Sequence, residues 1–146
     1  MTRRRIIGWA CRLSLCGIFV AASVPKILAP HDFAVAVFRY QMLPYPLVNL
    51  LAIFLPWIEL VAALALLTPA YKDAAAFILL GLLVVFTAAI ATDLVRGINI
   101  SCGCFSVSAE AGRIGWLEVL RDLAFMALAV LTWKFPPRLA PAKPRS

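Results

Sequence analysis

Two cysteines one residue apart, Cys102 and Cys104, are the residues of this chain best suited to covalent chemistry. Gly103 lies between them and makes accessible the tight turn that such close thiols need in order to bond. Consecutive α-carbons lie about 3.8 Å apart, so positions i and i+2 are separated by roughly 5–7 Å, and a disulfide needs about 4.4–6.8 Å. A bond between them is feasible but strained, and strain makes a disulfide a readier partner in exchange. The motif predicts a pair that donates, accepts or relays a disulfide.

Three other interpretations of this pair stay open. It could be a structural disulfide, although so small a ring constrains little chain, or a pair of inert thiols. A metal site would need further ligands, and we expect none because Cys11 and Cys16 lie toward the opposite membrane face and His31 is the only histidine. Cys11 and Cys16 are five residues apart and do not share a helix face. We expect them to be small apolar fillers, with a second redox pair as the alternative.

The composition indicates that lipid surrounds this chain. Of its 146 residues, 64% are hydrophobic and 14% are charged, whereas a soluble domain has roughly 25% charged residues. The net charge of +7 could suggest nucleic acid, but the basic residues cluster near the chain ends and flank apolar segments, as juxtamembrane charge does. We therefore expect no nucleic-acid binding. The clustered residues are Arg3, Arg4, Arg5, Arg12, Lys134, Arg138, Lys143 and Arg145.

Four apolar segments approach the roughly 20 residues that cross a bilayer. They cover about 6–28, 47–67, 74–95 and 116–135, and each should be helical because lipid cannot satisfy backbone polar groups. We expect an all-α polytopic membrane protein with a four-helix transmembrane domain over 1–135 and a disordered, basic cytoplasmic tail over 136–146. Alternatively, the first segment is a cleaved signal peptide, with an apolar stretch over 13–22 and a weak cleavage site at 21–23.

The basic ends predict that both termini are cytoplasmic. Segments 26–46 and 96–115 then lie outside, and with them Cys102 and Cys104, on the side where oxidation prevails. Within the first of these segments, Asp32 could cap a short helix over 33–42 that lies along the outer membrane surface. An ordered loop is the alternative. The apolar face of this helix would carry Phe33, Ala34, Val37 and Tyr40.

One carboxylate is predicted to lie near the bilayer midplane. Glu59 stands about midway along the second span, where an isolated charge costs about 2.5–3.5 kcal/mol on insertion scales. It should therefore be protonated, paired or facing a cavity. Pro56, one turn before it, removes a helix hydrogen bond and frees the carbonyl of Ala52, so a kinked, polar spot is expected within the bundle. Two roles stay open: an ion-pair network that fixes helix packing, or a proton or quinone-headgroup site beneath the cysteine segment. The candidate partners at the outer ends of other spans are Lys26, Asp93, Arg96, Arg121 and Asp122.

Several of these motifs resemble the methylamine utilisation MauE family, within the DoxX-like four-helix membrane proteins. The specific part is Arg-Gly-Ile-Asn-Ile-Ser-Cys-Gly-Cys-Phe at 96–105, and the resemblance extends over about 17–132. It implies an inner-membrane four-helix bundle and a role in maturing methylamine dehydrogenase, whose small subunit is secreted and rich in disulfides. Ser106 stands where this family usually has glycine, so a turn position can differ. Further matching residues are Lys26, Tyr40, Leu43-Pro44, Pro56-Trp57-Ile58-Glu59 and Leu120-Arg121-Asp122.

The leading hypothesis is a redox-active maturation factor of the bacterial inner membrane. Cys102 and Cys104 would exchange disulfides with a secreted, disulfide-containing client or a thioredoxin-like partner, and Arg96 or Arg113 would favour the thiolate. One alternative is a non-enzymatic assembly factor with structural cysteines. Another is the membrane subunit of a quinone-linked oxidoreductase. No cofactor is evident in the sequence. A quinone could accept electrons from the redox-active maturation factor, and the quinone-linked oxidoreductase would require one.

Overall fold

The computed structural model describes residues 3–97 and 115–135, and within these ranges every regular element is an α-helix. The prediction of an all-α protein is confirmed. The four long apolar segments are helical, and a shorter helix lies between the first two of them. The helices are α1 (Arg3–Leu28), α2 (Pro30–Arg39), α3 (Tyr45–Ala65), α4 (Lys72–Arg96) and α5 (Trp116–Lys134).

Three helices of the described ranges, α1, α3 and α4, are long and apolar enough to cross a membrane. Together they support a polytopic helical membrane protein. α5 has 19 residues and carries Glu118, Arg121 and Asp122 in its first two turns, and it is not among the three. That α5 is a fourth span, that the architecture is DoxX-like and that the termini are cytoplasmic all stay predictions.

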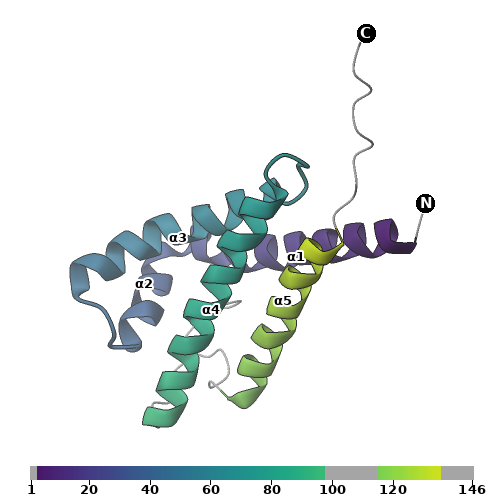
Figure 1. The fold of residues 1–146 in the computed structure, drawn as a ribbon. Helices are drawn as coiled ribbons and strands as arrows, with labels where there is room; N and C mark the ends of the chain where they lie inside the picture. The colour runs from purple at the N-terminus through teal and green to yellow at the C-terminus, as the bar shows by residue number, and fades with distance from the viewer. Residues whose placement is uncertain (1–2, 98–114, 136–146) are drawn as a thin grey trace.

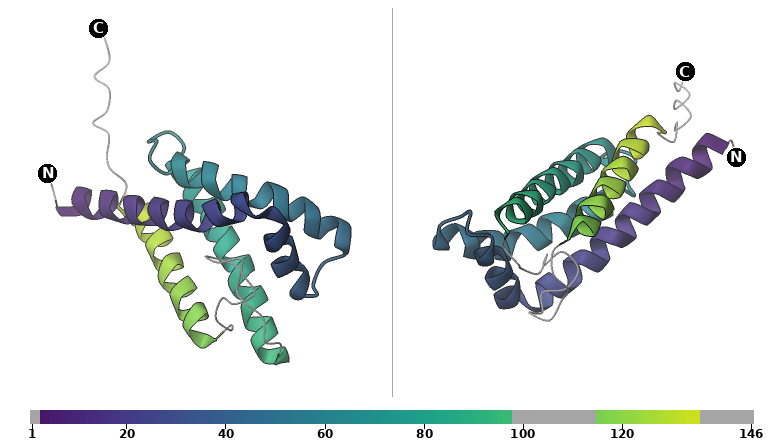
Figure 2. Two further views of the ribbon diagram at one scale, coloured as in Figure 1. Left: turned by 180° about the vertical axis from the view of Figure 1, so that it is seen from behind. Right: turned by 90° about the horizontal axis from the view of Figure 1, so that it is seen from below.

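The long helices form two antiparallel pairs. α1 packs chiefly against α3, and α4 packs chiefly against α5. Figure 1 and the left view of Figure 2 show the α1–α3 pair running across the α4–α5 pair, with the short α2 beside the first turns of α3. The start of α1 and the end of α5 lie near each other. Each pair therefore contributes one side to the interior of the molecule.

Small residues line the surfaces along which the helices meet. Ala62 and Ala63 of α3, Ala75 and Ala76 of α4 and Ala129 of α5 are all buried in one apolar cluster. Small side chains let helix backbones approach closely, which is how transmembrane helices pack in the absence of a hydrophobic driving force. Large apolar side chains, including those of Phe54, Trp57, Phe77 and Val85, instead point away from the bundle. This distribution is the one expected of helices surrounded by lipid.

Helix ends on both sides bracket segment 98–114. α4 ends at Arg96 and is capped by Gly97, whose φ of +70° is left-handed, a conformation that glycine adopts without a Cβ penalty. Its N–H bonds to the carbonyl of Leu94. α5 begins after Gly115, whose N–H donates to Glu118 Oε2 at 3.0 Å. The carboxylate of Glu118 therefore satisfies a donor at the start of α5 and complements the positive end of its dipole.

The helix predicted over 33–42 exists, but it covers Pro30–Arg39, so the ordered-loop alternative is wrong. The predicted cap is wrong too: Pro30 occupies the first turn, where its missing N–H costs nothing, and Asp32 lies inside that turn without a capping hydrogen bond. The predicted apolar face packs inward, because Phe33 and Tyr40 are buried. Whether α2 lies along the membrane surface stays a prediction.

Candidate functional site

The cysteine motif lies outside the described residues, as does Arg113. In the chain, Cys102, Gly103 and Cys104 follow the end of α4 and precede the start of α5. The described part of the candidate site therefore consists of the polar side chains that these helices and their neighbours bury.

A buried ion pair joins α1 to α3. Lys26 Nζ donates to Glu59 Oε2 at 2.9 Å and to Glu59 Oε1 at 3.1 Å, and both side chains are almost completely buried, at 3% and 2% exposure. The rings of Phe33 and Phe86 lie 5.1 and 5.3 Å from the same nitrogen, close enough for cation–π attraction. The carboxylate that the sequence predicts to be paired or to face a cavity is thus bound to Lys26.

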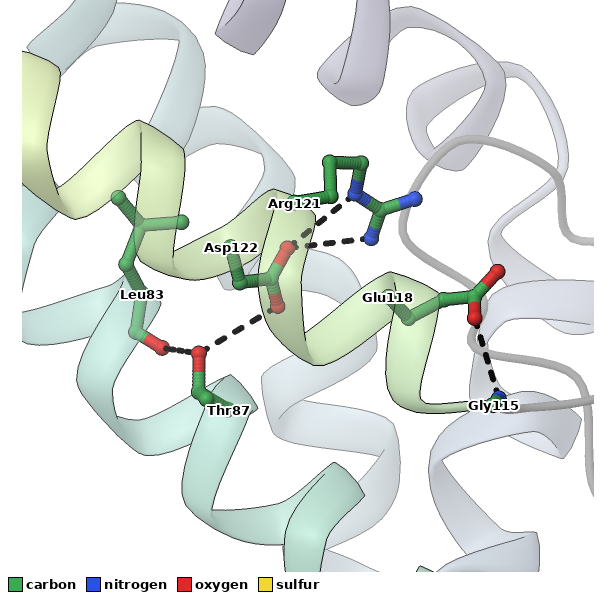
Figure 3. Close-up of polar contacts among 6 residues, drawn as sticks. All are labelled: Leu83, Thr87, Gly115, Glu118, Arg121 and Asp122. Atoms are coloured by element: carbon green, nitrogen blue, oxygen red, sulfur yellow. Dashed lines mark hydrogen bonds and ion pairs between the residues drawn. The ribbon is translucent and has the colours of Figure 1, made fainter.

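A second polar cluster joins α4 to α5 (Figure 3). Arg121 donates to Asp122 Oδ1 through Nε at 3.3 Å and Nη2 at 3.1 Å. The other oxygen, Asp122 Oδ2, lies 3.4 Å from the hydroxyl of Thr87. That hydroxyl has one proton and lies only 2.7 Å from the carbonyl of Leu83, the better acceptor by distance. Asp122 is only 3% exposed, so Oδ2 is a buried carboxylate oxygen whose hydrogen bond from Thr87 is long and weak.

Lys26, Glu59 and Asp122 line the same small cavity, of about 30 Å³. It lies where the α1–α3 pair meets the α4–α5 pair, and its remaining walls are apolar. Three of the residues that the sequence singled out are thus brought together from three helices. Arg121 is bound to Asp122 but is not part of the cavity wall. The apolar lining consists of Ile18, Phe19, Ala22, Leu83, Phe86 and Phe125.

Asp93 and Arg96 form a separate cluster near the end of α4. Arg96 Nη1 lies 3.6 Å from Asp93 Oδ1 and 3.5 Å from the carbonyl oxygen of Tyr40, to which it donates. Asp93 is fully buried, and neither of its carboxylate oxygens accepts a hydrogen bond within residues 3–97 and 115–135. Arg96 is partly exposed, six positions before Cys102, and is the described cation nearest to the motif in the chain.

Two buried residues were missed or misplaced by the sequence reasoning. Thr87 offered no signal, because a threonine within an apolar helix ordinarily bonds to its own backbone. Arg12 was assigned to the basic flank of the first span, but it is 1% exposed, with its guanidinium 5.8 Å from the ring of Trp9. Its interruption of an otherwise apolar segment was the signal that it lies within the bundle.

The two cysteines of α1 lie within the described ranges. Cys11 and Cys16 are buried free thiols, and Cys16 belongs to the main apolar cluster, as expected of small apolar fillers. Within residues 3–97 and 115–135, no group of three or more His, Cys, Asp or Glu side chains could hold a metal ion.

Comparison with known proteins gives one consistent result. A family model described as "Methylamine utilisation protein MauE" matches residues 4–135. The chain is 37% identical over 120 residues to the methylamine utilization protein MauE of Methylophilus methylotrophus. The aligned residues cover 82% of this chain and 63% of that relative. The chain is 35% identical over 138 residues to the MauE protein of Paracoccus denitrificans, covering 94% and 74%. No solved structure matches. The family model spans both helix pairs and the cysteine motif between α4 and α5, and the chain therefore belongs to the MauE family of methylamine utilisation proteins.

Proposed function

We propose that this protein is an inner-membrane factor of methylamine utilisation that helps to mature methylamine dehydrogenase. Membership of the MauE family is the observation that carries the proposal. The three membrane-length helices support a site of action at the bilayer. The substrate would be the secreted small subunit of the dehydrogenase, whose many disulfides need correct pairing.

The proposed chemistry is thiol–disulfide exchange by Cys102 and Cys104. A client thiolate attacks one sulfur of the Cys102–Cys104 disulfide and releases the other as a thiolate, which leaves a mixed disulfide. A second client thiolate then displaces the bound cysteine. The client gains one disulfide, and the pair is reduced to a dithiol. Exchange with the disulfide of a thioredoxin-like protein returns the pair to its oxidised form, so electrons balance at each step.

The residues beside the motif suit this chemistry. Arg96 is partly exposed near the end of α4, and a nearby guanidinium stabilises a thiolate. Its contacts with Asp93 and the carbonyl of Tyr40 hold it at the helix end from which the motif departs. Arg96 is thus a positioning and electrostatic group for the exchange rather than a reacting one.

The proposal includes a topology. α5 would be the fourth span, with Glu118, Arg121 and Asp122 toward its outer end and Lys134 at its inner end. Positive charge near both chain termini then faces the cytoplasm. Cys102 and Cys104 face the periplasm, where a secreted client can reach them.

Single substitutions of the motif test the proposal. In cells that make methylamine dehydrogenase, Cys102→Ser or Cys104→Ser should leave one thiol, whose thiolate attacks a disulfide of the small subunit and releases one client cysteine as a thiolate. With no second motif cysteine to resolve it, the mixed disulfide should accumulate, visible on non-reducing gels and identifiable by mass spectrometry. The double variant should lose mature dehydrogenase at normal membrane levels of this protein. Ser101→Ala, which keeps both thiols, is the matched control. Full maturation in the double variant would overturn the exchange chemistry and favour a non-enzymatic assembly factor.

The topology has its own test. A bulky, membrane-impermeant maleimide applied to reduced intact cells should modify the motif cysteines and leave Cys11 and Cys16 untouched. Modification from the cytoplasmic side alone would overturn the periplasmic placement.

A further inference from the structure

The cavity between the two helix pairs has room for water and is lined by three buried, charged side chains among apolar ones. A void needs about 10–15 Å³ to hold one water molecule, so about 30 Å³ offers room for one or two waters. Empty cavities in proteins are apolar, and hydrated ones offer two to four polar partners. Here Lys26, Glu59 and Asp122 are at most 3% exposed, and all of them line the cavity.

The polar atoms around this cavity have hydrogen-bonding capacity to spare. An ammonium group carries three N–H donors, and Lys26 directs two hydrogen bonds to Glu59. A carboxylate accepts about four hydrogen bonds. Among the residues that the structure describes, the donor nearest to Asp122 Oδ2 is the hydroxyl of Thr87, at 3.4 Å. A water between them would donate to the carboxylates of Glu59 and Asp122 and accept from Lys26, which satisfies groups that are costly to bury unpaired.

The charges that face the cavity come from three of the helices packed around it. α1 contributes the ammonium of Lys26, α3 the carboxylate of Glu59, and α5 the carboxylate of Asp122 with Arg121 bound to it. The lining residues of α4, Leu83 and Phe86, are uncharged, as is Thr87 beside Asp122, and none of the lining residues comes from α2. Glu118, one turn earlier on α5, also acts electrostatically on Asp122, so among the described residues two cations stand against three carboxylates, of which Glu59 and Asp122 are buried. One added proton therefore has two buried carboxylates that can hold it.

We infer that this cavity is a hydrated proton-binding site in which water connects Glu59 with Asp122, so that the two carboxylates take up and release a proton as one coupled unit. The side chain of Arg121 is 31% exposed and links Asp122 to the surface of the bundle. This inference does not depend on the cysteine chemistry proposed above, and a failure of one leaves the other standing.

Infrared spectroscopy of the full-length protein in lipid vesicles tests the inference. The carboxyl C=O band is followed against pH in H₂O and D₂O for the wild type, Glu59→Gln and Asp122→Asn. Coupled groups titrate as a pair, so each substitution should shift the midpoint of the remaining carboxyl by about one pH unit or more. The wild-type band should also shift in D₂O. Asp32→Asn, which removes an exposed carboxylate of α2, should leave this titration unchanged.

A cavity-filling variant separates the water from the carboxylates. Ala22→Val adds two methyl groups at a buried residue of the lining and should displace the water, which uncouples the two carboxyls while both remain. Ala21→Val, one position away on the exposed side of α1, is the matched control. Independent titration of Glu59 and Asp122 in the wild type, or a band that does not respond to D₂O, overturns the inference. If Ala22→Val does not fold, the two carboxamide variants decide the question alone.

Discussion

Breaking the Lys26–Glu59 pair should destabilise the bundle far more than its net contribution would suggest. At 2.9 Å, the attraction of two unit charges is about 6 kcal/mol at an effective dielectric constant of about 20. Desolvation costs several kcal/mol for each ion, so the intact pair contributes little in net terms. Lys26→Met removes the attraction but leaves the desolvation cost of Glu59 unmet. We expect the free energy of unfolding to fall by about 3–5 kcal/mol.

A double variant isolates this effect. Lys26→Met combined with Glu59→Leu removes both charges and keeps side chains of similar volume, and such replacements are neutral or stabilising by up to about 4 kcal/mol. The second substitution should therefore restore most of the stability that the first removes. Unfolding in mixed detergent micelles can be followed by the fluorescence of the four tryptophans.

An exposed pair provides the comparison. Lys72 and Asp73 lie 2.7 Å apart, but Asp73 is 62% exposed, and surface ion pairs contribute about 0–1 kcal/mol. Lys72→Met should therefore change the unfolding free energy by less than about 1 kcal/mol. If Lys26→Met costs no more than Lys72→Met, or if the double variant is as unstable as the single one, the reasoning about a buried, uncompensated carboxylate is refuted.

Three further predictions rest on local geometry. A Cβ at Gly8 would collide with the backbone carbonyl of Phe135, whereas one at Gly17 would meet nothing. Gly8→Ala should therefore lower the unfolding free energy by about 1–3 kcal/mol, and Gly17→Ala should raise it by about 0.5–1 kcal/mol. Equal effects of the two substitutions would contradict the close approach of α1 to the end of α5. Gly97→Ala should lower the unfolding free energy by about 1–2 kcal/mol because of its left-handed φ, while Gly81→Ala, in the open within α4, should raise it by about 0.5–1 kcal/mol, as at Gly17. In a variant that keeps only the two cysteines of α1, maleimide should react after denaturation and not in vesicles, since both thiols are buried; rapid labelling of the native protein would show that they are accessible.

Hydropathy predicted the long helices well because the formation of each helix depends only on its own residues. A run of about 20 apolar residues in lipid must satisfy its own backbone, and that requirement involves no other part of the chain. The start of α2 was predicted less well. Asp32 looked like a cap, but Pro30 was the stronger signal, because proline is favoured in the first turn of a helix.

The partners of the buried charges could not be predicted in the same way. Hydropathy gives the depth of Glu59 along its helix but not the direction in which its side chain points or which helix lies beside it. Lys26, Asp93, Arg96, Arg121 and Asp122 were all candidates. The packing of α1 against α3 selects Lys26, which is 33 residues away in the chain.

The amino-acid sequence alone determined that the chain is helical and apolar, that a charge within a span needs compensation, and that a cysteine pair separates the last two helices. Each of these depends on residue type and spacing along the chain. Only the tertiary structure decided that Arg12 is buried, that Glu59 binds Lys26, and that Asp122 faces the same small cavity. These depend on how helices are rotated and paired, and that arrangement is set by side-chain packing between segments distant in the chain rather than by any local pattern.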